Sequence, residues 1–287
     1  MNKTKYIILL LLSSVPVALI GFFVREITIS LNIYTASFYR LFIATIALGI
    51  ILPFFDKNTY KPNTKHLPMY AITGLAMAVN LALFNIANSL APIANVYLLA
   101  SVSPAIIILL SVLYLKEKIT QAKIIALLFT LVGIGVMNPL QSANILGNAL
   151  ALISGVTFAI FFTLMKKCDT GTGAGVTLWY FIFATLFSTP LLFFGHTGFV
   201  SAIPWLLGFA IISTTLTYIA TTLLLEHESA GTTSILQTII IPLCAIVVAY
   251  FAFMEIPSIR TLVGGGILVL GGIALELPNV LKMKKKR

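Results

Sequence analysis

The sequence predicts an all-α integral membrane protein with ten transmembrane helices, arranged as two inverted five-helix repeats. The first reason is composition: 59% of the 287 residues are hydrophobic and 9% are charged, whereas a soluble domain has about 25% charged residues. The second reason is the placement of the basic residues, and the third is an internal repeat. A soluble fold is therefore excluded as the main architecture.

Long apolar runs, broken by polar residues, Gly or Pro, divide the chain into ten segments of about the length that crosses a bilayer. The third and fourth segments are separated only by Leu90, Ala91 and Pro92. We separate them because one helix from 68 to 115 would be far longer than a bilayer is thick. The ten expected spans are 5–24, 34–54, 68–90, 92–115, 119–138, 145–166, 174–195, 203–225, 230–253 and 259–280.

The basic residues lie mostly on one side of this arrangement. With the N-terminus inside, 15 Lys and Arg residues fall in cytoplasmic segments, while only Arg25 and Arg260 fall on the other side. Cytoplasmic loops carry such an excess of basic residues. We therefore expect a multi-pass protein of the cell inner membrane with both termini in the cytoplasm. The net charge of +10 then indicates contact with the lipid bilayer and not with nucleic acid.

An internal repeat relates the two halves at an offset of 138 residues. Five spans in each half is an odd number, so the two halves have opposite orientations in the membrane. We expect a first repeat over 1–140 and a second, inverted repeat over 141–287. Secondary transporters use inverted repeats, with the substrate near the midplane. The matched positions are Ala91 and Ser229, Pro104 and Pro242, Glu117 and Glu255, and Gly133 and Gly271.

Several segments resemble the drug/metabolite transporter (DMT) superfamily, in particular its EamA-like family. The run Leu-Tyr-Leu-Lys-Glu-Lys-Ile-Thr over 113–120 closes the fourth span, and Ala-Phe-Met-Glu-Ile-Pro-Ser over 252–258 closes the ninth. The segment Ala36–Ala44 looks like the family's second helix, with Arg40 at its arginine position. The first span departs from the family, with Ser13-Ser14-Val-Pro16 where a Trp-Gly-Ser/Thr type of run is common.

This resemblance implies ten helices in two inverted repeats around a central cavity that opens to one side at a time. It also implies the export of amino acids or similar metabolites more often than their uptake. It does not identify the substrate, and the oligomeric state stays open.

Polar side chains inside spans are costly in lipid and therefore point to function. We select Asn80 and Asn88 on the third span, Tyr97 on the fourth, Tyr218 on the eighth and Gln237 on the ninth as candidate substrate contacts. The alternative for these residues is hydrogen bonding between helices.

Three further residues within spans have two possible roles each. Arg40, in the second span, could pair with a substrate carboxylate, or could extend to the surface or hold a carbonyl group. Pro104 and Pro242 lie in the middle of their spans, where they could act as hinges or a gate, or could simply kink the bundle.

Carboxylates are missing from the interior of the spans. No Asp lies within any span, Glu117 and Glu255 follow span ends, and Glu276 lies near the end of the tenth span. A buried carboxylate is the usual proton carrier of a proton-coupled transporter. We therefore expect net transport to follow the substrate gradient, by uniport or exchange.

The sequence offers no catalytic set, metal site or cofactor motif. The three histidines lie in loops or at span ends, and the two cysteines lack the spacing of metal ligands. We expect a secondary transporter or facilitator for a small molecule, without cofactor or enzymatic activity. A non-transporting membrane scaffold or sensor and, less favoured, a membrane-embedded enzyme are the alternatives.

Overall fold

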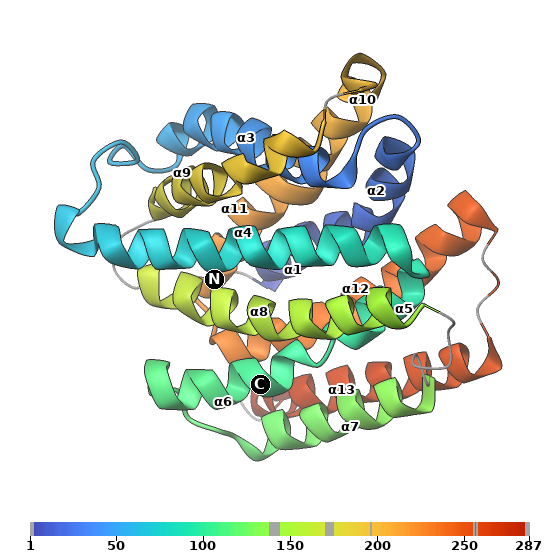
Figure 1. Cartoon of the computed structure of the whole chain (residues 1–287). Helices are drawn as coiled ribbons and strands as arrows, with labels where there is room; N and C mark the ends of the chain where they lie inside the picture. The colour runs from blue at the N-terminus through green and yellow to red at the C-terminus, as the bar shows by residue number, and fades with distance from the viewer. Residues whose placement is uncertain are drawn as a thin grey trace.

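The computed structural model describes residues 3–137, 144–169, 175–195, 197–254, 256 and 258–284. Over these residues the chain forms helices and connecting turns, without a strand. Most helices run alongside one another as a bundle, with α7 (Gln121–Met137) and α13 (Ile259–Lys284) along its lower edge in Figure 1.

Eight helical segments among these residues are long and apolar enough to cross a membrane. The expected fifth and tenth spans, 119–138 and 259–280, correspond to α7 and α13, whose apolar stretches Gln121–Val136 and Leu262–Gly271 are shorter. The described part of the chain is thus that of an all-helical membrane protein with eight candidate spans. These are Thr4–Thr28, Ile33–Phe54, Thr64–Leu90, Ile93–Leu115, Ile145–Cys168, Val176–Phe194, Phe199–Leu225 and Ala230–Phe253.

Several of these spans consist of more than one helix. The first contains α1 (Lys3–Ala18) and α2 (Ile20–Thr28), and the fourth contains α5 (Ile93–Ala100) and α6 (Ser103–Leu115). The eighth expected span contains α10 (Phe199–Ala210), a π-helical turn η5 (Ile211–Leu216) and α11 (Thr217–Leu225). The other long helices are α3 (Ile33–Ile51), α4 (Leu67–Leu90), α8 (Ile145–Asp169), α9 (Val176–Ser188) and α12 (Ala230–Phe253).

The separation of the third and fourth spans lies where the sequence predicts it. Helix α4 ends at Leu90, Ala91 is extended, and α5 begins at Ile93 after Pro92. Proline disfavours a helical conformation in the residue before it, so Pro92 ends α4 and allows a new helix to begin.

Two repeat-related helices end in the same way. Lys116 follows α6 with φ 56°, and Met254 follows α12 with φ 54°. They are the non-glycine residues with positive φ in the described part of the chain. Their positions differ by the same 138 residues as the matched pairs of the sequence, so the two halves share a left-handed helix end just before Glu117 and Glu255. Glu255 itself lies outside the described residues.

The two repeat-related prolines do not have the same structural role. Pro242 lies inside the continuous helix α12. Pro104 instead lies in the first turn of α6, after a break at residues 101–102. A proline in the first turn removes no helical hydrogen bond, so only Pro242 interrupts the bonding of a continuous helix.

Small residues on α8 allow its close approach to the fourth span. A Cβ atom on Gly155 would lie 2.8 Å from the carbonyl oxygen of Ala100, and one on Gly147 would lie 2.8 Å from Cβ of Ala91. Such close approach of backbones is typical of helix packing in membranes. It brings α8 against α4 and α5, where it forms one wall of the central cavity.

Candidate binding site

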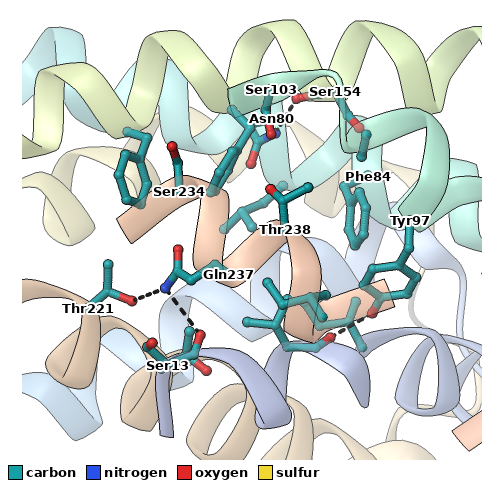
Figure 2. A pocket seen from close by; sticks show the side chains of 18 of the residues that line it. Ser13, Asn80, Phe84, Tyr97, Ser103, Ser154, Thr221, Ser234, Gln237 and Thr238 are labelled. Carbon is teal, nitrogen blue, oxygen red and sulfur yellow. Dashed lines mark hydrogen bonds between the residues drawn. The ribbon is translucent and has the colours of Figure 1, made fainter. Parts of the chain in front are cut away.

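A cavity lies between the two halves of the chain. Its lining residues come from α1, α2, α3, α4, α5 and α6 of the first half and from α8, η5, α11 and α12 of the second. Figure 2 shows polar side chains from both halves facing this space. Binding sites for small molecules have this form: mainly apolar walls with a few placed polar groups.

Arg40 reaches the cavity from α3, and its side chain is fully buried. Nε donates a hydrogen bond to Oγ1 of Thr214 at 2.8 Å, and Nη1 donates to Oδ1 of Asn85 at 2.9 Å. The guanidinium carbon lies 4.3 Å from the ring centre of Phe209. Within the described part of the chain, Nη2 has no hydrogen-bond partner and Arg40 forms no ion pair.

Asn80 lines the cavity from α4 and bonds to the opposite half. Its Nδ2 donates to the carbonyl oxygen of Ser154 at 2.8 Å and lies 3.4 Å from Oγ1 of Thr157. Figure 2 shows this contact at the α8 wall. Asn80 therefore joins α4 to α8 and also contributes a polar side chain to the lining.

Tyr97 lines the cavity from α5 and is held at both its ring and its hydroxyl group. The hydroxyl donates to the carbonyl oxygen of Val17 at 2.6 Å, and the amide of Gly21 lies 3.4 Å from the same oxygen. The ring of Phe84 packs edge-on against it at 5.2 Å. Tyr97 thus fixes α5 against the junction of α1 and α2.

Gln237 lines the cavity from α12. Its Nε2 lies 3.3 Å from Oγ1 of Thr221 and 3.5 Å from the carbonyl oxygen of Ser13, as Figure 2 shows. Both bonds are near the upper limit for a hydrogen bond and are correspondingly weak. The amide of Gln237 can therefore exchange these partners for a ligand at low cost.

The η5–α11 segment carries hydroxyl groups that no protein group satisfies. Oγ of Ser213 and Oγ1 of Thr217 are buried without a hydrogen bond, and both residues line the cavity. The hydroxyl of Tyr218, also in the lining, forms no hydrogen bond to any described residue. In contrast, Thr214 and Thr215 donate to carbonyl groups five residues earlier, a spacing that the π-helical turn provides.

Five of the six candidate contacts therefore meet at one cavity: Arg40, Asn80, Tyr97, Tyr218 and Gln237. The structure does not bring Asn88 to its wall. Nδ2 of Asn88 donates to the carbonyl oxygen of Phe84 at 2.9 Å, and its Oδ1 is buried without a partner. Of the two candidate hinges, Pro242 lines the cavity and Pro104 does not.

Sequence reasoning missed Ser213 and Asn85 as participants in the site. The polar residues Ser213, Thr217 and Thr221 recur every fourth position, and this spacing was the available signal for one polar helix face. The role of Asn85 had no such signal, because it depends on the place of Arg40 on another helix.

A second polar cluster lies at one end of the bundle, outside the cavity. Glu117 follows α6, and its carboxylate accepts hydrogen bonds from the backbone amides of Ala230 at 2.8 Å and Gly231 at 3.4 Å. Nζ of Lys123 lies 3.4 Å from the same carboxylate. The first turn of α12 is thereby tied to the connection between α6 and α7.

Comparison with known proteins gives matches over the whole chain. The family model described as EamA-like transporter family matches residues 4–138 and, a second time, residues 145–276. An uncharacterized transporter of Archaeoglobus fulgidus is 26% identical, covering 91% of this chain and 93% of its own length. The pseudopaline exporter of Pseudomonas aeruginosa is 25% identical, covering 94% and 95%. A solved crystal structure has a TM-score of 0.75 at 13% identity, covering 96% of this chain and 98% of that chain, and so shares the fold.

Proposed function

The chain belongs to the EamA-like transporter family, and we propose on this premise that it is a secondary transporter that exports small metabolites such as amino acids by alternating access. The single observation that carries the proposal is the central cavity, because its lining is shared between the two halves. A cavity at such an interface opens to one side or the other when the halves move relative to each other.

Two observations support ten helices in two inverted repeats, 1–140 and 141–287. The family model matches once in each half. The left-handed helix ends at Lys116 and Met254 are separated by the repeat offset. With α7 and α13 counted as spans, each half has five, and the halves must then face opposite ways. An even number of spans puts both termini on the same side of the membrane, and the excess of basic residues makes that side the cytoplasm. A reporter fused after Arg287 is expected to be active only as a cytoplasmic type, and periplasmic activity would overturn this topology.

The composition of the cavity wall favours transport over catalysis. Its described lining includes no Asp, Glu, His or Cys, the side chains that most often serve as general acids, bases or nucleophiles. The export direction is supported by one relative that is named an exporter.

The direct test is counterflow in proteoliposomes. Vesicles with purified protein are loaded with an unlabelled metabolite mixture and diluted into trace labelled amino acids, sugars or nucleosides. We expect transient accumulation of at least one labelled compound, and none in vesicles without protein. Failure of every compound to accumulate in the presence of correctly inserted protein would count against transport and would favour the scaffold or sensor alternative.

A further inference from the structure

We propose that the cavity contains a subsite for a single carboxylate group, formed by Arg40, Ser213, Thr217 and Tyr218, and that the cargo is a small molecule with one carboxylate and an apolar body. The inference deepens the proposed function and rests on it, since the subsite is part of the same cavity. It assigns a chemical class to the cargo, which family membership alone does not provide.

The first observation is that the charge of Arg40 is only partly satisfied. Its two hydrogen bonds go to the neutral acceptors Thr214 and Asn85. Nη2 has no partner among the described residues, although the side chain is fully buried and lines the cavity. A buried charge without a counter-ion is costly, and the cost falls when an anion binds.

The second observation is that further donors lie on the segment that holds Arg40. Thr214 accepts the Nε bond of Arg40, and its neighbours on η5–α11 include the unpartnered hydroxyls of Ser213 and Thr217. Tyr218, on the same segment, also lines the cavity, and its hydroxyl forms no hydrogen bond to a described residue. A carboxylate has about four acceptor positions on its two oxygens, so one guanidinium nitrogen and neighbouring hydroxyl groups can bind it together.

The third observation concerns charge balance in the cavity. Arg40 is the only Lys or Arg among the described lining residues, and no acid is present there. A monocarboxylate neutralises the site. A phosphate monoester with about two negative charges would leave an excess negative charge in a low-dielectric cavity, and a cation would meet no counter-ion. The ring walls of Phe84, Phe158 and Phe162 suit an apolar remainder.

The experiment compares acids with their uncharged amides on the purified full-length protein. The probes are 3-phenylpropanoate and simple monocarboxylates, each paired with its primary amide, the protein amino acids without amide partners, and phenyl phosphate as a dianion. Ligand binding is measured as an increase in the thermal unfolding midpoint. We expect at least one acid to bind, with its amide bound roughly ten-fold or more weakly, because a charge-assisted bond is lost.

Variants separate a ligand contact from a structural role. Thr217→Val and Tyr218→Phe remove hydroxyl groups that form no hydrogen bond in the structure, so the unliganded protein should unfold at the same temperature. Each should nevertheless bind the acid about ten-fold more weakly. Arg40→Gln should abolish the preference for acid over amide. The control Arg260→Gln, at the exposed start of α13, should leave the preference intact.

Different failures separate the subsite from the proposed function. Equal binding of acids and amides, tighter binding of phenyl phosphate, or wild-type acid affinity in both hydroxyl variants would overturn the subsite. Counterflow of neutral compounds without any of acids would also overturn it, while leaving transport intact. Arg40-dependent binding of acids without counterflow of any compound would support the subsite and count against transport. Absence of both binding and counterflow would overturn both.

Discussion

Arg40 and Glu117 are both charged and both largely buried, yet the protein treats them differently. The Glu117 carboxylate accepts hydrogen bonds from two backbone amides and pairs with the ammonium group of Lys123. The Arg40 side chain donates to two neutral acceptors and lies over one aromatic ring. The charge of Glu117 is thus satisfied by the fold itself, whereas that of Arg40 lacks a counter-ion in the described structure. The difference distinguishes a charge that joins helices from a charge that is available to a ligand.

The position of Glu117 beside the first turn of α12 explains why its charge is stabilised. The first amides of a helix lack partners within the helix and carry a partial positive charge. The Glu117 carboxylate satisfies two of those amides on α12 from a different part of the chain. No comparable acid reaches Arg40 from any described residue.

The largest expected effect comes from giving Arg40 a fixed partner. Asn85→Asp places a carboxylate where Oδ1 now accepts from Nη1 at 2.9 Å. An internal ion pair would compete with the cargo, and we expect transport of acids to fall about 100-fold, in the range found for disrupted interfacial charge pairs. The unfolding midpoint should not fall, because the arginine gains a counter-ion. Counterflow and thermal unfolding check the two parts.

A matched substitution serves as the control for this prediction. Asn58→Asp makes the same chemical change in an exposed loop and should leave counterflow unchanged. Wild-type transport by the Asn85→Asp protein would show that the open charge of Arg40 does not serve the cargo.

The next largest effect is expected at Glu117. Glu117→Gln leaves Lys123, whose side chain is 9% exposed, without its anion. We expect a loss of about 2 kcal/mol in stability, the size of a lost hydrogen bond to a charged group. The double variant Glu117→Gln/Lys123→Met should recover part of the loss. Unfolding midpoints of the wild type, Glu117→Gln, Lys123→Met and the double variant give a double-mutant cycle. Additive losses would argue that the pair is not coupled.

A smaller effect is expected from changing Thr214, whose hydroxyl group positions the Arg40 side chain. Thr214→Val removes the acceptor of Nε and the bond from Oγ1 to the carbonyl oxygen of Phe209. We expect roughly three- to ten-fold weaker binding of acids and a loss of about 1 kcal/mol in stability. Thr215→Val is the control, because its hydroxyl makes the same kind of backbone bond, to Ala210, without touching Arg40. It should show the stability loss alone.

The smallest expected effect is that of a pH gradient, which should drive no uphill transport. Among the residues whose side chains the structure describes, no carboxylate lines the cavity, so a proton has no Asp or Glu station there. The measurement is accumulation in proteoliposomes with an imposed pH gradient, while valinomycin and potassium clamp the voltage. Uphill accumulation beyond what the ionisation of the substrate explains would contradict uniport or exchange.

The sequence predicts the framework because apolar length and helix-breaking residues are local properties. The separation of α4 from α5 around Leu90, Ala91 and Pro92 was predicted from length, because one helix over 68–115 would be far longer than a bilayer is thick. The π-helical turn over 211–216 was not predictable, because that segment is apolar and hydroxyl-rich in the manner of any membrane helix. The break between α1 and α2 at Leu19 had only the nearby Pro16 as a signal.

For the site, sequence periodicity predicts which face of a helix a side chain occupies, but not whether its position along the helix lies at the cavity. Asn80 and Asn88 share a face of α4, yet only Asn80 reaches the cavity. The partners of Arg40 lie 45 and 174 residues away in sequence. Whether a buried arginine is neutralised depends on such distant contacts, and a single sequence does not contain them.

Because Arg40 lacks a counter-ion in the described structure, the empty cavity carries a positive charge that responds to the membrane potential. Moving one elementary charge across 100 mV is worth about 2.3 kcal/mol, or roughly a 50-fold concentration ratio. When a monocarboxylate fills the subsite, the moving unit is neutral and insensitive to voltage. When the cavity reorients empty, its positive charge is drawn toward the negative face of the membrane, which is the cytoplasm. For a cargo of net charge −1, each cycle of uniport would then carry one negative charge outward, so the resting potential would add to the substrate gradient that drives export.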